Sequence, residues 1–150
     1  MSKARKRFRE PLNRDDYWMG MAFMLAAGSP SSRQQGCIIV GLNNEPVGMA
    51  HDGSPKTMQQ ECEHVVHAET NALFNAKLPL AGGTAYVTHT PCYHCVLSLA
   101  AANIKRIVYF QTKPLDPDTL DAMRCAYGQI DEFRGNLNWM RDYIKTLSIF

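Results

Sequence analysis

Two short motifs constrain this chain more than any other feature of its sequence. The first is His67-Ala68-Glu69, and the second, 25 residues further along, is Pro91-Cys92-Tyr93-His94-Cys95. Cys92 and Cys95 are three residues apart, so in a first helical turn both sulfur atoms point to one side. Each motif is common by chance, but their order and the proline before Cys92 make the combination much more specific. The fold must bring these two distant segments together if they act as one site.

The residue types in the two motifs are typical of a zinc site. We expect both motifs at helix N-termini, where partial positive charge favours the thiolate form of Cys92 and Cys95. Two thiolates and the neutral imidazole of His67 supply three ligands and leave the fourth position of Zn²⁺ open for water. Glu69 can approach that water without displacing it and can move its protons. The pattern favours a catalytic metal centre over a closed structural one.

Plainer interpretations stay open at this point. Cys92 and Cys95 could be ordinary buried thiols, or half of a structural zinc knuckle that Cys62 or His64 completes. Glu69 could be a carboxylate on a helix surface. The structural context of the motifs has to decide between these interpretations.

Composition limits the chain to a single domain. Its 150 residues are 45% hydrophobic and 20% charged, which is too apolar for a disordered chain and too short for two ordinary domains. No apolar run approaches the roughly 18 residues that a membrane-spanning helix needs. The number of cysteines is odd, and no apolar segment typical of a secretory signal follows the N-terminus. We therefore expect a reducing, cytoplasmic setting and no membrane partner.

The net charge of +2 is unevenly distributed. Residues 1–10 carry five Lys and Arg side chains against one Glu, and the rest of the chain is slightly acidic. Such a basic arm could contact nucleic acid, but a frayed, solubilising terminus is the plainer interpretation. We expect a basic N-terminal arm over residues 1–10, one domain over residues 11–150, and no nucleic-acid partner.

Apolar runs and turn residues predict a hairpin followed by alternating helices and strands. Strands are expected over residues 37–40, 47–50, 84–88 and 107–110, with a hairpin turn at 42–45. Alternation of this kind indicates an α/β sandwich around a mixed sheet. Cys37 is expected in the core of a strand and Cys125 in the core of a helix.

Five helices are expected from capping residues and helical periodicity. The first should run from a cap at Asn13 to a stop at Gly28. The second should run from Cys62 or Val65 to Lys77, and the third from Cys92 to Ala102. The last two are expected from a cap at Asp118 to Tyr127, and over residues 137–147.

The sequence around both motifs resembles the zinc-dependent nucleobase deaminases, and among them the deoxycytidylate (dCMP) deaminases. Residues 67–73 are similar to that family's H-A-E-x-N-A-[IL] segment, and residues 33–40 to its R-x-x-V-G-A-V-I-V segment. Residues 86–92 and 104–109 are similar as well, so the resemblance covers about residues 15–113. It implies a three-layer α/β/α cytidine-deaminase-like fold around a mixed five-stranded sheet.

The resemblance also implies a reaction, the hydrolysis of dCMP to dUMP and ammonia, which would supply dUMP for dTTP synthesis. His67, Cys92 and Cys95 would bind Zn²⁺, and Glu69 would shuttle the protons. The backbone N–H of Ala68 would then hold O2 of the base, while the carbonyl of Pro91 would hold the leaving amine.

Further substrate contacts follow from the same resemblance. Asn71 stands at the position of a sugar contact, and Arg33, with Ser29 and Ser31 beside it, at that of a 5′-phosphate contact. Lys113 stands where many relatives have a tyrosine; a lysine could also hold the phosphate. Arg33 and Lys113 could equally be solvated surface charges, and Asn71 a capping amide.

Many dCMP deaminases are hexamers that dCTP with Mg²⁺ activates and dTTP inhibits, so the resemblance implies a homo-hexamer with regulatory nucleotides. The regulatory G-Y-N-G-x-P segment of the family reads Ala50-His51-Asp52-Gly53-Ser54-Pro55 here. Asp52 and Gly53 are regulatory candidates, although a carboxylate is a poor neighbour for a triphosphate. Glu61 and His64 are further candidates. Cys62 and His64 could instead bind a second, structural zinc.

Two other functions stay open. A related deaminase could act on a cytosine nucleoside, a free base or single-stranded nucleic acid, and the basic arm mildly favours the last. A zinc-stabilised binding module without activity would leave Glu69 unexplained. The bulky pairs Trp139-Met140 and Tyr143-Ile144 could form either core or an interface.

Overall fold

The computed structural model describes residues 11–54, 64–77 and 79–147, and these form a five-stranded sheet in the order β2-β1-β3-β4-β5. β1 (Gly36–Val40) pairs antiparallel with both β2 (Pro46–His51) and β3 (Thr84–Val87). β4 (Arg106–Tyr109) and β5 (Gln129–Glu132) continue the sheet parallel to β3. The predicted hairpin and the mixed five-stranded sheet are confirmed.

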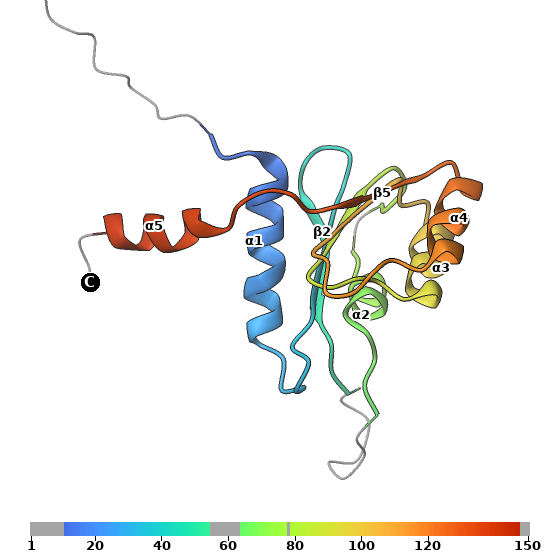
Figure 1. The fold of residues 1–150 in the computed structure, drawn as a ribbon, viewed down its shortest axis with the longest axis horizontal. Helices are drawn as coiled ribbons and strands as arrows, with labels where there is room; N and C mark the ends of the chain where they lie inside the picture. Colours follow the sequence, from blue (N-terminus) through green and yellow to red (C-terminus); the bar gives the residue numbers. More distant parts are fainter. Residues whose placement is uncertain (1–10, 55–63, 78, 148–150) are drawn as a thin grey trace, which may run out of the picture.

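Helices cover both faces of this sheet (Figure 1). α1 (Arg14–Ala27) lies on one face, and α2 (Ala68–Phe74), α3 (Tyr93–Ala101) and α4 (Pro117–Cys125) lie on the other. Alternate residues of β1 enter the two cores, because Ile38 packs on the α1 side and Ile39 on the other. β1 is consequently buried along its whole length, as a strand covered on both faces should be.

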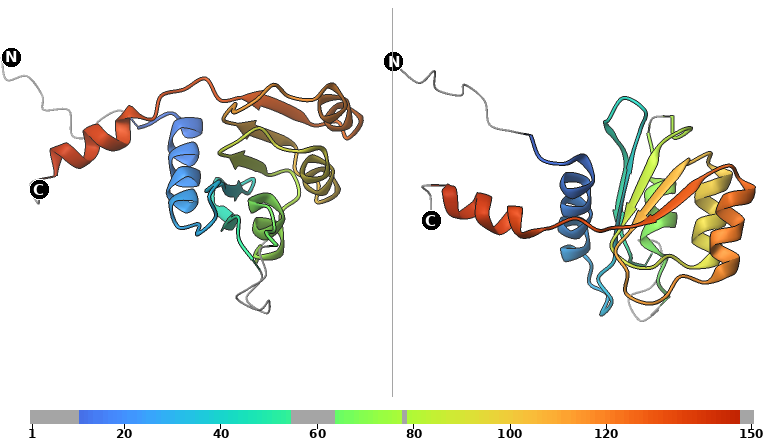
Figure 2. Two further views of the ribbon diagram at one scale, coloured as in Figure 1. Left: turned by 60° about the horizontal axis from the view of Figure 1, so that its bottom comes forward. Right: turned by 45° about the horizontal axis from the view of Figure 1, so that its top comes forward.

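α5 (Asn138–Thr146) lies on the outer side of α1, away from the sheet (Figure 2). Trp139 and Met140 pack over Gly20 of α1, where a Cβ atom would come within 2.6 Å of the Trp139 ring. Only glycine leaves room for this contact. The Trp139 indole N–H also donates to the carbonyl of Asp16 at 3.2 Å. This pair of bulky residues is therefore part of the fold.

The second bulky pair of α5 stays at the surface. Tyr143 is 43% exposed and Ile144 is 47% exposed. No helix in the part of the chain that the structure describes is long and apolar enough to cross a bilayer.

The caps of the helices confirm some boundaries and correct others. Asn13 caps α1 as predicted, because its side chain accepts the N–H groups of Asp15 and Asp16. The cap of α4 is Asp116 rather than Asp118; Asp116 accepts the N–H of Asp118 at 2.8 Å, and the helix ends at Cys125 before the predicted Tyr127. Pro117 at the first helical position explains the earlier start, since its fixed φ suits that position.

The second helix begins later and ends earlier than the predicted span from Cys62 or Val65 to Lys77. Val66 forms an antiparallel bridge with Gly53, which holds the chain before His67 in an extended conformation. α2 therefore begins only at Ala68, with His67 as its N-cap residue. At its other end the N–H of Lys77 donates to Val47 of β2 at 3.2 Å, outside the helix. Cys62 lies outside the described residues.

Two further expectations concern the last third of the chain. β5 was not located from the sequence, because Gln129–Glu132 is a half-exposed edge strand without an apolar run. The expectation that Cys125 is core is wrong: its side chain is exposed, and its thiol lies 4.0 Å from the carboxylate of Asp121. Cys37, in contrast, is fully buried in β1 as predicted.

A network of charges fixes α1 to the far half of the sheet. The guanidinium of Arg106 on β4 donates to both carboxylate oxygens of Asp15, each at 2.8 Å, and to Asp131 of β5 at 2.9 Å. The hydroxyl of Tyr86 donates to the same Asp15 at 2.7 Å. The Arg106 guanidinium outweighs partial burial and lowers the pKa of Asp15 below its ordinary value. A bidentate pair of this kind also fixes orientation.

Candidate active site

The starts of α2 and α3 bring His67, Cys92 and Cys95 together. His67 and Cys92 are the N-cap residues of these two helices, and Cys95 lies in the first turn of α3. Nδ1 of His67 lies 3.2 Å from Sγ of Cys95 and 3.7 Å from Sγ of Cys92. The three atoms lie within 4.8 Å of one another, a spacing that ligands of one ion with bonds of about 2.0–2.3 Å require.

The surroundings of Cys95 disfavour its thiolate form. Burial first, and then the charge of Glu69, raise the pKa of the Cys95 thiol well above its ordinary value. For Cys95, these two effects outweigh the expected preference of a helix N-terminus for the thiolate. A coordinating metal ion reverses that balance, since it binds the thiolate directly. One imidazole nitrogen and two sulfur atoms are a donor set that fits Zn²⁺ and leaves a position open.

The structural zinc knuckle is not supported by the described residues. His64 is described and exposed, and it does not belong to the metal-donor cluster. Its carbonyl accepts the hydroxyl of Ser54 at 2.6 Å.

Glu69 lies in the first turn of α2 and is fully buried, so it is not a carboxylate of the helix surface. Neither of its oxygens has a well-formed hydrogen bond among the described residues, but Oε1 lies 3.0 Å from Nε2 of His89. Burial alone raises the pKa of Glu69, yet the contact with His89 outweighs it and lowers the pKa below the ordinary value. The arrangement provides a buried, ionised carboxylate with free lone pairs.

Two residues of this site were not identified from the sequence. His89 is 7% exposed and follows β3. The hydroxyl of Thr90 donates to the carbonyl of Lys113 at 2.6 Å and accepts the N–H groups of Thr112 and Lys113. The available signal was position alone, because any side chain just before the Cys92 motif lies close to the site.

A hollow of about 260 Å³ adjoins the metal donors. Arg33 and Lys113, both exposed, contribute to its wall. The structure therefore brings the two charged residues among the predicted phosphate contacts to the hollow that His67 and Cys92 also line. The residues that line it are Arg33, Gln35, His67, His89, Thr90, Cys92, Thr112 and Lys113.

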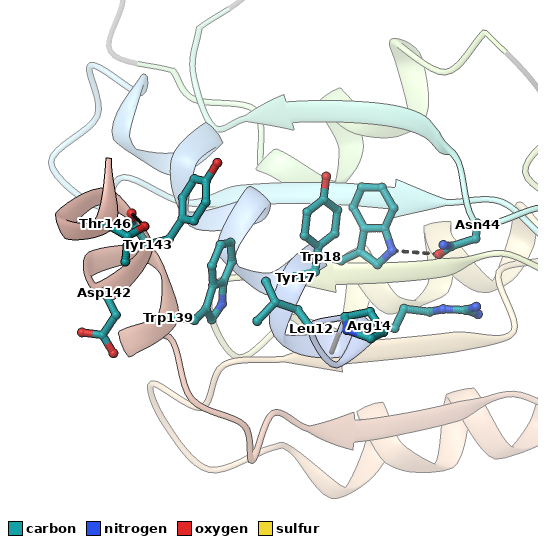
Figure 3. A pocket seen from close by; sticks show the side chains of 10 residues that line it. Leu12, Arg14, Tyr17, Trp18, Asn44, Trp139, Asp142, Tyr143 and Thr146 are labelled. Carbon is teal, nitrogen blue, oxygen red and sulfur yellow. Dashed lines mark hydrogen bonds between the residues drawn. The ribbon is translucent and has the colours of Figure 1, made fainter. Parts of the chain in front are cut away.

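A larger hollow, of about 950 Å³, lies between α1 and α5 (Figure 3). Tyr17, Trp18 and Trp139 give it an aromatic wall, and the Trp18 indole N–H donates to Asn44 at 2.9 Å. None of the predicted site residues lines it. The larger hollow is therefore not the candidate active site, which is located by the metal-donor cluster of His67, Cys92 and Cys95.

Residues 12–111 match the family model of the cytidine and deoxycytidylate deaminase zinc-binding region. The chain belongs to this family. The donor cluster and the buried Glu69 both lie inside the matched range.

The chain is similar to deoxycytidylate deaminases from distant sources. It is 33% identical over 118 residues to that of Mycobacterium phage D29, covering 63% of this chain and 92% of the phage protein. It is 29% identical over 129 residues to that of Homo sapiens, covering 75% and 72%. The fold resembles the apo dCMP deaminase of cyanophage S-TIM5, with a TM-score of 0.69, 24% identity, and coverage of 79% and 96%. The α/β/α deaminase fold is thus confirmed.

Ser29 and Ser31 occupy a different place in this deaminase from Arg33. The buried hydroxyl of Ser29 donates to the carbonyl of Asp52 at 2.9 Å and accepts the N–H of Ser31 at 3.1 Å. Neither serine lines the hollow beside the metal donors. Their direct contact with a phosphate stays a prediction, while their observed hydrogen bonds shape the loop that carries Arg33.

Asp52 is a buried carboxylate in the same loop system. Its Oδ1 accepts the N–H of Gln35 at 2.8 Å. Burial raises the pKa of Asp52, but the nearby hydroxyl of Ser29 and the hydrogen bond from the N–H of Gln35 outweigh it and lower the pKa below the ordinary value. Gly53 beside it lines a separate hollow of about 460 Å³ together with Ser31. The regulatory candidate Glu61 lies outside the described residues.

The remaining predicted contacts lie around the start of α2 and α3. The side-chain amide of Asn71 donates to the carbonyls of His51 at 3.1 Å and Val66 at 3.4 Å, so it connects α2 to the end of β2. Ala68 and Pro91 are both buried beside the metal donors in the chain. Their backbone contacts with a base stay predictions.

Proposed function

We propose that this deaminase hydrolyses dCMP to dUMP and ammonia, with Zn²⁺ held by His67, Cys92 and Cys95. The observation that carries the proposal is the hollow that joins the metal donors to two cations, Arg33 and Lys113. A free base needs only the donors, whereas a 5′-phosphate needs charged partners as well. The names of the curated relatives support the same substrate.

A Zn²⁺ ion held by His67, Cys92 and Cys95 would supply a water of lowered pKa as the nucleophile at neutral pH. Glu69 accepts a proton from that water and delivers it to N3 of the cytosine. After the water oxygen has bonded to C4, Glu69 carries the second proton of that water from the C4 hydroxyl to the amine; the C4–N bond breaks and ammonia leaves, so that water and dCMP yield dUMP and ammonia. The burial of Glu69 keeps these protons from bulk solvent.

The other residues of the site orient the nucleotide. We assign the N–H of Ala68 to O2 of the base and the carbonyl of Pro91 to the leaving amine. Because the amide nitrogen of Asn71 already donates to backbone carbonyls, its amide oxygen is the atom that would meet the sugar. Ser29 and Ser31 support the loop on which Arg33 reaches the phosphate.

A substrate panel tests this assignment. We expect dCMP to be deaminated at least 10-fold more efficiently than deoxycytidine, cytosine or a single-stranded oligonucleotide, measured as ammonia release. R33A and K113A should each raise KM for dCMP by about 10- to 100-fold, because a hydrogen bond to a charged group is worth about 1.5–3 kcal/mol. The same variants should leave deoxycytidine turnover within about twofold of wild type.

R141A is the matched control, since Arg141 is an exposed arginine of α5 outside the hollow. It should leave KM for dCMP unchanged. Activity on the oligonucleotide alone, or equal use of deoxycytidine and dCMP, would overturn the proposal in favour of another cytosine substrate.

We infer a homo-hexamer that dCTP with Mg²⁺ activates and dTTP inhibits, with Asp52, Gly53, Glu61 and His64 as candidate contacts. The product dUMP would serve dTTP synthesis, so inhibition by dTTP would be feedback inhibition by the end product. A cytoplasmic location stays a prediction. The half-exposed Tyr143 and Ile144 offer apolar surface for assembly.

Light scattering tests assembly and regulation together. We expect a particle of six chain masses with dCTP and Mg²⁺, and a dCMP rate that falls when dTTP is added. A monomer whose rate responds to neither nucleotide would contradict both inferences.

A further inference from the structure

The side chain of His89 contacts Glu69, and the proposed reaction gives it no role. In the segment between β3 and Cys92, that reaction uses only the backbone carbonyl of Pro91. His89 lies after β3, 20 residues from Glu69 in sequence. Nε2 of His89 lies 3.0 Å from Oε1 of Glu69, and the two side chains are 9% and 0% exposed. Because Glu69 is the proposed proton shuttle, a buried polar group this close to its carboxylate can decide how that carboxylate is oriented.

We propose that His89 is a positioning residue that holds the Glu69 carboxylate in the orientation needed for proton transfer. The proposal rests on the proposed function, because it concerns the same site. His89 would not touch the substrate or the metal. It would act only through Glu69.

The surroundings of Glu69 leave this task to His89. Among the described residues, His89 makes a polar side-chain contact with the Glu69 carboxylate at 3.0 Å, and the thiols of Cys37 and Cys95 lie near enough for its charge to raise their pKa. Thiols are weak hydrogen-bond donors. A buried carboxylate with only weak partners can occupy more than one rotamer, so the imidazole of His89 is the group that can select one.

The backbone that carries His89 is itself fixed on both sides. The hydroxyl of Thr88 accepts the N–H of Gly36 at 2.9 Å, and Thr90 is hydrogen-bonded to the loop after β4. Nδ1 of His89 is buried without a partner among the described residues. The contact with Glu69 is thus the only polar contact of the ring within the described part of the chain, and the ring is presented from a rigid segment.

His89 also lines the hollow beside the metal donors, so a direct contact with the nucleotide is the competing role. The two roles differ in their kinetics. Misplacing a catalytic group by about 1 Å can cost about 100-fold in rate and lowers kcat, whereas losing a substrate contact raises KM.

Three substitutions separate the roles. The amide nitrogen of Gln can take the place of Nε2, while that of Asn is too short to reach Glu69 and Leu has no donor. We expect H89L and H89N to lower kcat for dCMP by about 10- to 100-fold, with KM within about threefold of wild type. H89Q should restore kcat to within about fivefold. Zinc content should stay stoichiometric in all three.

Two readouts without turnover complete the test. In crystals of H89L the Glu69 carboxylate should leave its wild-type rotamer, and in crystals of H89Q it should keep it. On the E69Q background, H89L should leave the Kd for dCMP within about threefold.

Equal kcat losses in H89Q and H89L, an unchanged Glu69 rotamer in H89L, or a Kd or KM raised more than 10-fold would overturn the proposal. If wild type does not deaminate dCMP, the proposed function fails, but the Glu69 rotamers in the crystals still decide the positioning role.

Discussion

The turnover of dCMP by E69Q should be about 100- to 10,000-fold lower than that of wild type, while the zinc content stays the same. General acid–base catalysis typically contributes a factor of this size. Glutamine keeps the size of the side chain but neither accepts nor delivers a proton. Glu69 is fully buried and is not a member of the donor cluster. The substitution should therefore prevent proton transfer without changing zinc binding.

The measurement is ammonia release beside zinc content in the same preparation. E132Q is the matched control, because Glu132 lies in β5 and does not line the hollow beside the metal donors. It should turn over dCMP at the wild-type rate. Turnover by E69Q equal to wild type would sink the proposed mechanism, and loss of zinc in E69Q would place Glu69 among the ligands.

C95A should lose zinc, activity and thermal stability together. Only the folded chain holds the donors of α2 and α3 in one place, so bound metal stabilises the fold by mass action. At a metal concentration 1,000 times Kd this stabilisation is about 4 kcal/mol. Chelation of the wild-type protein should therefore lower its Tm and abolish its activity, and added Zn²⁺ should restore both.

C125A is the control for this change. Cys125 is an exposed cysteine at the end of α4, outside the donor cluster, and its loss should change neither zinc content nor Tm by a measurable amount. A C95A variant with full zinc content, or a wild-type Tm that chelation does not move, would contradict the assignment of the ligands.

Local patterns predicted the parts of this site that depend on local geometry. The spacing of Cys92 and Cys95 is enough to place both sulfur atoms at the start of one helix, and the structure confirms it. The hairpin of β1 and β2 followed from its turn residues in the same way. These features need no knowledge of the rest of the chain.

The features that the sequence did not reveal depend on distant partners. The predicted start of α2 was too early because Val66 pairs with Gly53. Helical periodicity carries no information about such a distant backbone pairing. β5 is a polar edge strand that exists through its pairing with β4. The contact of His89 with Glu69 joins two segments 20 residues apart and has no periodic signature.

Asp52 directly follows β2, and it holds the loop between α1 and β1 that carries Arg33. Its carboxylate holds the N–H of Gln35 and its carbonyl holds the hydroxyl of Ser29. These two anchors lie on either side of Arg33 in the chain. Two hydrogen bonds thus join the residue before Gly53 to the loop that carries Arg33, which lines the hollow beside the metal donors. A movement of Asp52 that keeps both hydrogen bonds therefore moves Ser29 and Gln35 with it.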